Sequence, residues 1–167
     1  MSISIPTAIF DKYHEGMTEI ISKFGIDATI YYPPLKINCE NCYFTNIAGV
    51  SASNVYRPGG PYPFSSPEMC PYCLGLGYKE SVESDTIHVR AYFDKKSWSK
   101  LQIPIGIKDG DVWTIGHMKD LIKVQRAAYI TLPNQNTTAN PYTLLQEPIP
   151  WGFGKDRYFS AFWQRGE

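Results

Sequence analysis

The chain has 167 residues, of which 43% are hydrophobic, 14% aromatic and only 19% charged, so it is able to bury a core and is not intrinsically disordered. Its 16 Lys and Arg balance 16 Asp and Glu, and this neutrality argues against nucleic-acid binding as the main function. A basic signal-peptide region and an apolar run long enough to span a membrane are both missing from the sequence. We therefore expect one domain over residues 1–167, with a small insertion and no membrane partner.

The first expected element is a helix over residues 7–24. Apolar residues recur there every three or four positions and form one stripe. Pro6 suits the first turn of this helix, and Gly25 suits its end at the C′ position. His14 lies beside the stripe, where we expect a hydrogen-bonded surface or boundary histidine. Residues 26–32 are β-branched and aromatic, and they predict a strand that leads into the first cysteines.

All four cysteines lie in one segment as two C-x-x-C pairs, Cys39-Glu-Asn-Cys42 and Cys70-Pro-Tyr-Cys73. Two such pairs that close one loop have the spacing of a tetrahedral, four-thiolate zinc site, although iron takes the same ligands. Four thiolates leave the metal no open position for water, so its role would be structural. We expect residues 39–78 to form a zinc-binding insertion, because the metal would fold a segment with little core of its own.

The loop between the two pairs reads Tyr56-Arg57-Pro-Gly-Gly-Pro-Tyr62-Pro-Phe64. Proline blocks ladder hydrogen bonds and glycine frees φ, which together predict an ordered but non-repetitive loop. Aromatic residues are enriched where proteins meet other proteins. We therefore interpret Tyr56, Arg57, Tyr62 and Phe64 as an interaction loop, with a loop packed only on itself as the alternative.

The rest of the chain is rich in strand signals. Residues 86–93 alternate, so that His88 and Arg90 face solvent or a partner. Lys108-Asp-Gly110 predicts a hairpin turn. Residues 120–132 fit a helix or a strand, with a strand favoured for the second half. The expected strands are 86–93, 101–107, 111–115, 127–132, 142–147 and 157–164. These predict a mainly β (α+β) fold, a small β-barrel or sandwich with its core over 86–164, because closure removes exposed edges.

Two alternative functions follow from the same cysteine segment. Cys70-Pro-Tyr-Cys73 matches the glutaredoxin active-site motif, but there a helix starts at the first thiol, whereas Leu-Gly-Leu-Gly follows here. A zinc ribbon with exposed aromatic residues could stack on single-stranded bases, although few positive charges lie near the insertion. The sequence has no phosphate-binding glycine loop and no G-x-S-x-G motif, and its histidines are far apart. We expect no enzyme activity.

A series of motifs runs through the chain after Cys39. In order, they are the first C-x-x-C pair, Gly59-Gly60-Pro61-x-Pro63-Phe64, Cys70-Pro-x-Cys73-x-Gly-x-Gly, Val89-Arg90-x-Tyr92, Lys95-x-x-Trp98, Thr114-x-Gly116-x-Met118-x-Asp120-Leu121-x-Lys123-Val124 and Gly152-Phe153-x-x-Asp156-Arg157-Tyr158-Phe159-x-x-Phe162-Trp163. Together they resemble a group of zinc-knuckle virion structural proteins of tailed bacteriophages. In size and expected architecture the chain is similar to neck proteins of the head-completion or stopper type.

This resemblance implies a structural virion protein that forms a ring in the neck, between head and tail. The ring would contain six or twelve copies joined by heterologous contacts. Its partners would be portal or adaptor proteins and tail-terminator proteins, and DNA would pass through its lumen without sequence-specific binding. The protein would be assembled in the host cytoplasm and would be found in the virion.

Overall fold

The chain divides into two compact units, Met1–Pro33 with Ser84–Glu167 and Pro34–Glu83. The computed structural model describes residues 6–45, 49–66, 68–94, 108, 110–133, 141–153 and 155–166. Each unit has its own core of buried residues. The inserted unit, Pro34–Glu83, extends beyond the expected range of 39–78 at both ends.

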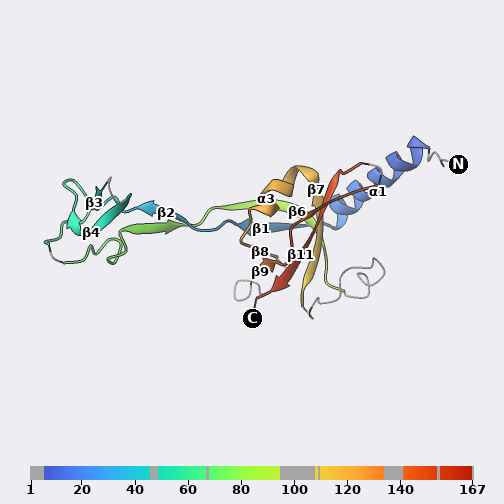
Figure 1. The fold of residues 1–167 in the computed structure, drawn as a ribbon. Helices are drawn as coiled ribbons and strands as arrows, with labels where there is room; N and C mark the ends of the chain where they lie inside the picture. Colours follow the sequence, from blue (N-terminus) through green and yellow to red (C-terminus); the bar gives the residue numbers. More distant parts are fainter. Residues whose placement is uncertain are drawn as a thin grey trace. The chain divides into compact units, whose positions relative to one another are not determined.

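The larger unit contains a closed barrel of six antiparallel strands (Figure 1). The strands in order around it are β11 (Tyr158–Arg165), β7 (Val112–His117), β6 (Ser84–Tyr92), β1 (Ile26–Tyr31), β8 (Tyr129–Thr131) and β9 (Tyr142–Leu144). The barrel closes because β9 pairs with the C-terminal end of β11, Trp163–Arg165. Closure of this kind removes exposed edges. The predicted mainly β fold with an N-terminal helix is confirmed, and the barrel alternative applies rather than the sandwich.

Shorter elements complete the larger unit. β10 (Ile149–Trp151) pairs with the N-terminal end of β11. The 3₁₀ helix η1 (Met118–Asp120) and α3 (Leu121–Gln125) link β7 to β8. The ambiguous segment 120–132 therefore begins as helix and ends as the predicted strand. The helices in the described part of the chain are all too short or too polar to cross a lipid bilayer.

The expected core range of 86–164 was too narrow, because β1 is a full barrel strand between β6 and β8. The sequence interpretation had placed residues 26–32 only as a lead into the first cysteine pair. Strand pairing is set by long-range contacts, which a local residue pattern does not reveal. The predicted strand at 101–107 and Asp109 of the predicted hairpin turn lie outside the described residues.

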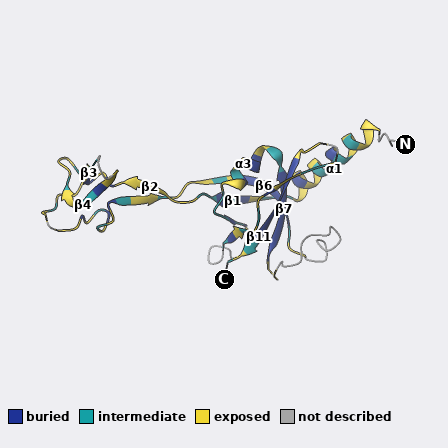
Figure 2. Cartoon of the chain, viewed as in Figure 1, coloured by how far each residue is buried: buried dark blue, intermediate teal, exposed yellow. Residues whose placement is uncertain are grey.

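Strands β7 and β11 are buried on both faces, as the dark strands in Figure 2 show. Val112, Phe159 and Trp163 point into the barrel and belong to its interior cluster. The alternate residues Trp113, Ile115, Tyr158 and Phe162 form a second cluster with Ile21. Because Ile21 belongs to α1 (Thr7–Phe24), this helix covers the outer face of the barrel there. The predicted helix bounds of 7–24 are confirmed.

The end of α1 is held by β6. His88 Nε2 lies 3.0 Å from the carbonyl oxygen of Ile21, and Arg90 Nη1 donates to the carbonyl oxygen of Phe24 at 2.7 Å. The Phe24 carbonyl is one of those that a helix leaves without an internal partner, whereas the Ile21 carbonyl also accepts from the amide of Gly25 at 2.8 Å. His88 and Arg90 face away from the barrel interior as expected, and the His88 side chain is 40% exposed to solvent. Both also bind the end of the chain's own helix, which the sequence did not predict.

The smaller unit consists of two short β-ribbons. β2 (Leu35–Asn38) pairs with β5 (Tyr78–Ser81), and β3 (Cys42–Thr45) pairs with β4 (Val50–Tyr56). Both ribbons are antiparallel. Two-stranded ribbons are at best marginally stable in water. The core of this unit is the four cysteines, with Phe64 and Tyr72 packed against them.

Candidate metal centre

The four cysteine sulfurs lie within 4.8 Å of one another, and none forms a disulfide. The Sγ atoms of Cys39 and Cys70 are 4.0 Å apart, and those of Cys42 and Cys73 are 3.7 Å apart. Ligand bonds of about 2.3 Å in a tetrahedron place the sulfurs about 3.8 Å apart. A disulfide would require about 2.05 Å. The predicted cluster of Cys39, Cys42, Cys70 and Cys73 is therefore present, with spacing that fits a tetrahedral metal site.

Tight turns place each cysteine pair. The amide of Cys42 donates to the carbonyl of Cys39, and the amide of Gly75 donates to the carbonyl of Cys70, both at 3.2 Å. Gly77 has a φ of 75°, and a Cβ atom there would lie 2.4 Å from the carbonyl oxygen of Ser51. Only glycine fits this position, where its amide donates to Cys73 Sγ at 3.2 Å.

Burial and hydrogen bonding act in opposite directions on the thiols, all of which are buried. Burial raises the pKa of Cys39 and of Cys42, because it disfavours a charged thiolate. Burial also raises the pKa of Cys70, but hydrogen bonds from the Asn41 side chain and from backbone amides outweigh it and lower that pKa to about 6. Four buried thiolates together need a metal ion to balance their charge.

Both middle residues of the first cysteine pair contact the second pair. Glu40 Oε1 accepts a hydrogen bond from the Tyr72 hydroxyl at 2.6 Å, and Asn41 Nδ2 donates to Cys70 Sγ at 3.2 Å. Asn41 is completely buried. Sequence reasoning missed Asn41, and its position inside the C-x-x-C pair is the one signal that could have indicated it.

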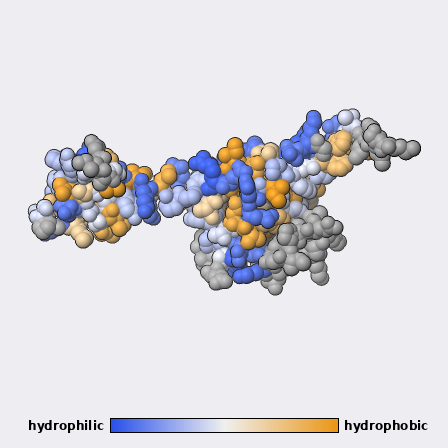
Figure 3. Space-filling view, in the orientation of Figure 1, coloured by the Kyte–Doolittle hydropathy of each residue, from blue (hydrophilic) through white to orange (hydrophobic). Residues whose placement is uncertain are grey.

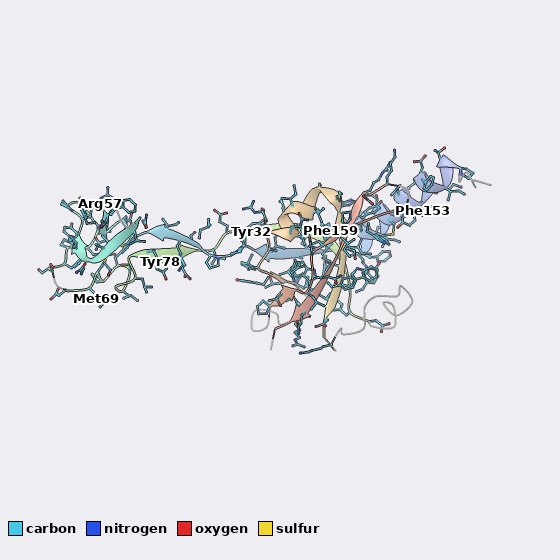
Figure 4. All side chains as sticks on the ribbon, in the orientation of Figure 1. Tyr32, Arg57, Met69, Tyr78, Phe153 and Phe159 are labelled. Atoms are coloured by element: carbon cyan, nitrogen blue, oxygen red, sulfur yellow. The ribbon has the colours of Figure 1, made fainter. Side chains whose placement is uncertain are left out.

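The expected interaction loop is partly packed on the unit itself. The Tyr56 hydroxyl donates to the carbonyl of Gly60 at 2.9 Å, and the Tyr56 ring meets Phe64 edge-on at 5.8 Å between centroids. Tyr56 and Phe64 therefore fit the alternative of a self-packed loop. Tyr62 is 56% exposed and remains available to a partner. Arg57, which Figure 4 labels, is exposed as well.

Large apolar side chains are exposed beside the second cysteine pair. Leu74, Met69 and Leu76 are 81%, 72% and 61% exposed. Leu74 also has a φ of 52°, a left-handed conformation that is uncommon for a residue other than glycine. Figure 3 shows hydrophobic residues at the surface of this unit, and Figure 4 labels Met69 there.

The surroundings of Cys70 differ from those of a glutaredoxin site. Residues 71–77 form turns and bends instead of a helix, and Cys70 is fully buried. A reactive thiol of that class is partly exposed at a helix N-terminus. This geometry gives no support to the oxidoreductase alternative.

The histidines are placed separately from the cysteines. His14 is buried and not at the boundary as expected, and its Nε2 donates to the carbonyl of Phe153 at 3.1 Å. The ring of His117 lies 5.8 Å from that of Tyr158, and burial lowers the pKa of His117. Within the described ranges, the cysteine cluster is the one group of His, Cys, Asp or Glu with metal-ligand spacing.

Comparison of the chain with protein-family models, with curated proteins and with solved structures gave no significant match.

Proposed function

We propose that this protein is a structural, non-enzymatic subunit that docks onto neighbouring proteins through its smaller unit, Pro34–Glu83, which a zinc ion stabilises. One observation carries the proposal: four buried cysteine sulfurs form the core of a unit that exposes large apolar side chains. A metal with four thiolate ligands has no open position for substrate or water. Its contribution is to fix the shape of the surface around it.

The metal in this proposal is zinc. Zinc prefers a closed tetrahedron of thiolates in structural sites and has no redox chemistry of its own. The sulfur spacing of 3.7 and 4.0 Å fits that geometry. Elemental analysis of the purified full chain should give one zinc per chain, whereas a chain that carries iron would overturn this choice of metal.

The proposed docking surface consists of the exposed side chains of Tyr62, Met69, Leu74 and Leu76, which lie between the two cysteine pairs or next to the second pair in the sequence. A rigid surface loses little conformational entropy when it binds, so more of the contact energy appears as affinity. Exposed apolar side chains gathered in one region mark interaction sites in soluble proteins. The unit would thus present a preformed apolar patch to a partner.

We place this subunit in the neck of a tailed bacteriophage, as a ring of six or twelve copies between portal or adaptor and tail-terminator proteins. The motifs support a virion protein of a tailed bacteriophage, the size of the chain supports the neck, and the closed six-strand barrel is compatible with this placement. Copies in a closed ring meet through two different patches. The balance of 16 basic and 16 acidic residues suits a lumen through which DNA slides without sticking.

Mass spectrometry of purified virions tests this placement. We expect the protein at six or twelve copies per particle, and its absence from virions would overturn the proposal. A Leu74→Ser, Met69→Ser variant should keep its zinc but fail to join particles. Salt-sensitive gel-shift binding to single-stranded DNA would instead favour the nucleic-acid alternative.

A further inference from the structure

The buried carboxamide of Asn41 joins a metal ligand to an exposed loop residue. Asn41 Nδ2 donates to Cys70 Sγ at 3.2 Å and to the carbonyl oxygen of Tyr62 at 2.8 Å. Asn41 Oδ1 accepts from the amide of Tyr62, also at 2.8 Å. One rigid planar group therefore contacts the sulfur of Cys70 and both backbone hydrogen-bonding groups of Tyr62.

The side chain uses its full donor capacity in these contacts. A carboxamide offers two N–H hydrogens and a carbonyl oxygen. The two hydrogens go to Tyr62 and Cys70, and the oxygen goes back to Tyr62. Because Asn41 is completely buried, water cannot replace a bond that is lost. A shift of the Cys70 sulfur would consequently disturb the backbone position of Tyr62.

The ring of Tyr62 is tied to the same two cysteine pairs. It stacks on Tyr72 with 5.3 Å between centroids, and the Tyr72 hydroxyl donates to Glu40. Lys79 Nζ lies over the Tyr72 ring. Glu40 and Tyr72 are each a middle residue of a C-x-x-C pair, so the ring and the backbone of Tyr62 both depend on the arrangement of the pairs.

We propose that Asn41 is a positioning residue of the metal centre, which makes the presentation of Tyr62 at the surface depend on bound metal. A metal-bound thiolate is a charged, fixed acceptor, and hydrogen bonds to charged acceptors are the stronger ones. Without the metal, the sulfur of Cys70 has no ligand bond to fix it beside the Asn41 amide. The hydrogen bonds from Asn41 then no longer hold the backbone of Tyr62 in one position. This inference rests on the metal binding in the proposed function but not on the ring or the virion.

Two measurements on the full chain test it. Cobalt(II) in place of zinc gives a thiolate-to-metal charge-transfer band, which reports the hydrogen bonding of the sulfurs. Hydrogen exchange of the Tyr62 amide reports the loop, and Pro61 and Pro63 on either side carry no amide hydrogen. The variants are Asn41→Ala, Asn41→Asp and, as a matched control, Asn38→Ala, since Asn38 is exposed in β2 of the same unit.

In the metal-loaded wild type we expect a protected Tyr62 amide, and protection should disappear when a chelator removes the metal. Asn41→Ala should shift the cobalt band and speed Tyr62 exchange about tenfold or more, as the loss of about one hydrogen bond implies. Asn41→Asp keeps the acceptor for the Tyr62 amide but has no hydrogen for Cys70. It should therefore shift the band with a smaller effect on exchange. Asn38→Ala should match the wild type.

Equal protection of Tyr62 with and without metal would overturn the inference, as would wild-type exchange in metal-loaded Asn41→Ala. Loss of metal from both Asn41 variants would also overturn it, because Asn41 would then be required for the site itself to form. A wild-type chain that binds no metal would overturn the proposed function as well. If Asn41→Ala bound metal normally and its Tyr62 amide exchanged as in the wild type, this inference would be overturned but the proposed function would not.

Discussion

His88 joins the end of α1 to the barrel, because its Nε2 lies 3.0 Å from the carbonyl oxygen of Ile21. These same two atoms leave no room for a side chain at Gly25. Its φ of −72° is one that any residue can adopt. A Cβ atom there would lie 2.2 Å from the Ile21 oxygen and 2.4 Å from His88 Nε2. Gly25 does end the helix as expected, but it is needed for this close approach and does not adopt the left-handed conformation that is common for glycine at the C′ position.

Gly25→Ala should lower the free energy of unfolding of the larger unit by about 1–3 kcal/mol, because the nearest atom is backbone and cannot move cheaply. Gly16→Ala is the matched control. A Cβ atom at Gly16 meets nothing within 4 Å, so alanine should stabilise the helix by about 0.5–1 kcal/mol. Urea unfolding followed by tryptophan fluorescence measures both. Equal effects of the two substitutions would show that β6 does not constrain the helix end.

Inside the barrel, the indole Nε1 of Trp163 donates to Thr114 Oγ1 at 2.8 Å, and both residues are fully buried. Thr114→Val keeps the side-chain shape but leaves the indole N–H without an acceptor. We expect a loss of about 1–3 kcal/mol in the free energy of unfolding. Thr143→Val, at an exposed position of β9, should change it by less than about 0.5 kcal/mol. A neutral result at Thr114 would mean that the indole finds another partner.

The Tyr32 hydroxyl donates to Asp85 Oδ2 at 2.7 Å, and this hydrogen bond, with help from Lys123, holds the pKa of Asp85 below its usual range. A depressed carboxyl pKa stabilises the fold above the unfolded-state value of about 3.9 and loses that effect as the pH falls through the folded-state pKa. Tyr32→Phe should raise the pKa of Asp85 toward its usual value in an NMR titration. Tyr31→Phe, whose ring stacks on Tyr129, should leave it unchanged.

The sequence predicted features that local spacing encodes. The helix over 7–24 followed from an apolar stripe with helical period, and the cysteine cluster followed from two C-x-x-C pairs. Closure of the barrel depends on β8 and β9, which have three residues each. Strands this short carry little alternation, so their pairing partners were not evident. Residues 26–31 form a longer strand of six residues, and they were not assigned to the barrel because their pairing with β6 and β8 depends on long-range contacts.

The contacts around the metal centre could not be predicted from residue spacing either. The C-x-x-C pattern leaves its two middle residues unspecified, and in most proteins Glu and Asn are exposed. Here Asn41 is buried because three hydrogen bonds compensate its carboxamide. His88 and Arg90 show a related limit. The alternating residue pattern correctly placed both side chains outside the barrel. It could not show that they bind the helix end, because Ile21 lies 67 positions from His88 in the sequence.

Removal of the metal should unfold the smaller unit and leave the barrel intact. The cysteines are the core of Pro34–Glu83, whereas the barrel has its own clusters of buried residues. Cys39→Ser removes one thiolate and should abolish binding of one metal ion per chain. The order of residues 56–64 should be lost with it, which hydrogen exchange can measure.

Tryptophan fluorescence separates the two units in this experiment, because all four tryptophans lie in Ser84–Glu167 and none in Pro34–Glu83. The unfolding transition seen by tryptophan should therefore change by less than about 0.5 kcal/mol in Cys39→Ser, since separate sites act additively. Chelator treatment of the wild type should reproduce the variant. A chain that keeps its metal after Cys39→Ser, or a barrel that unfolds together with the loop, would contradict a stabilising role confined to the inserted unit.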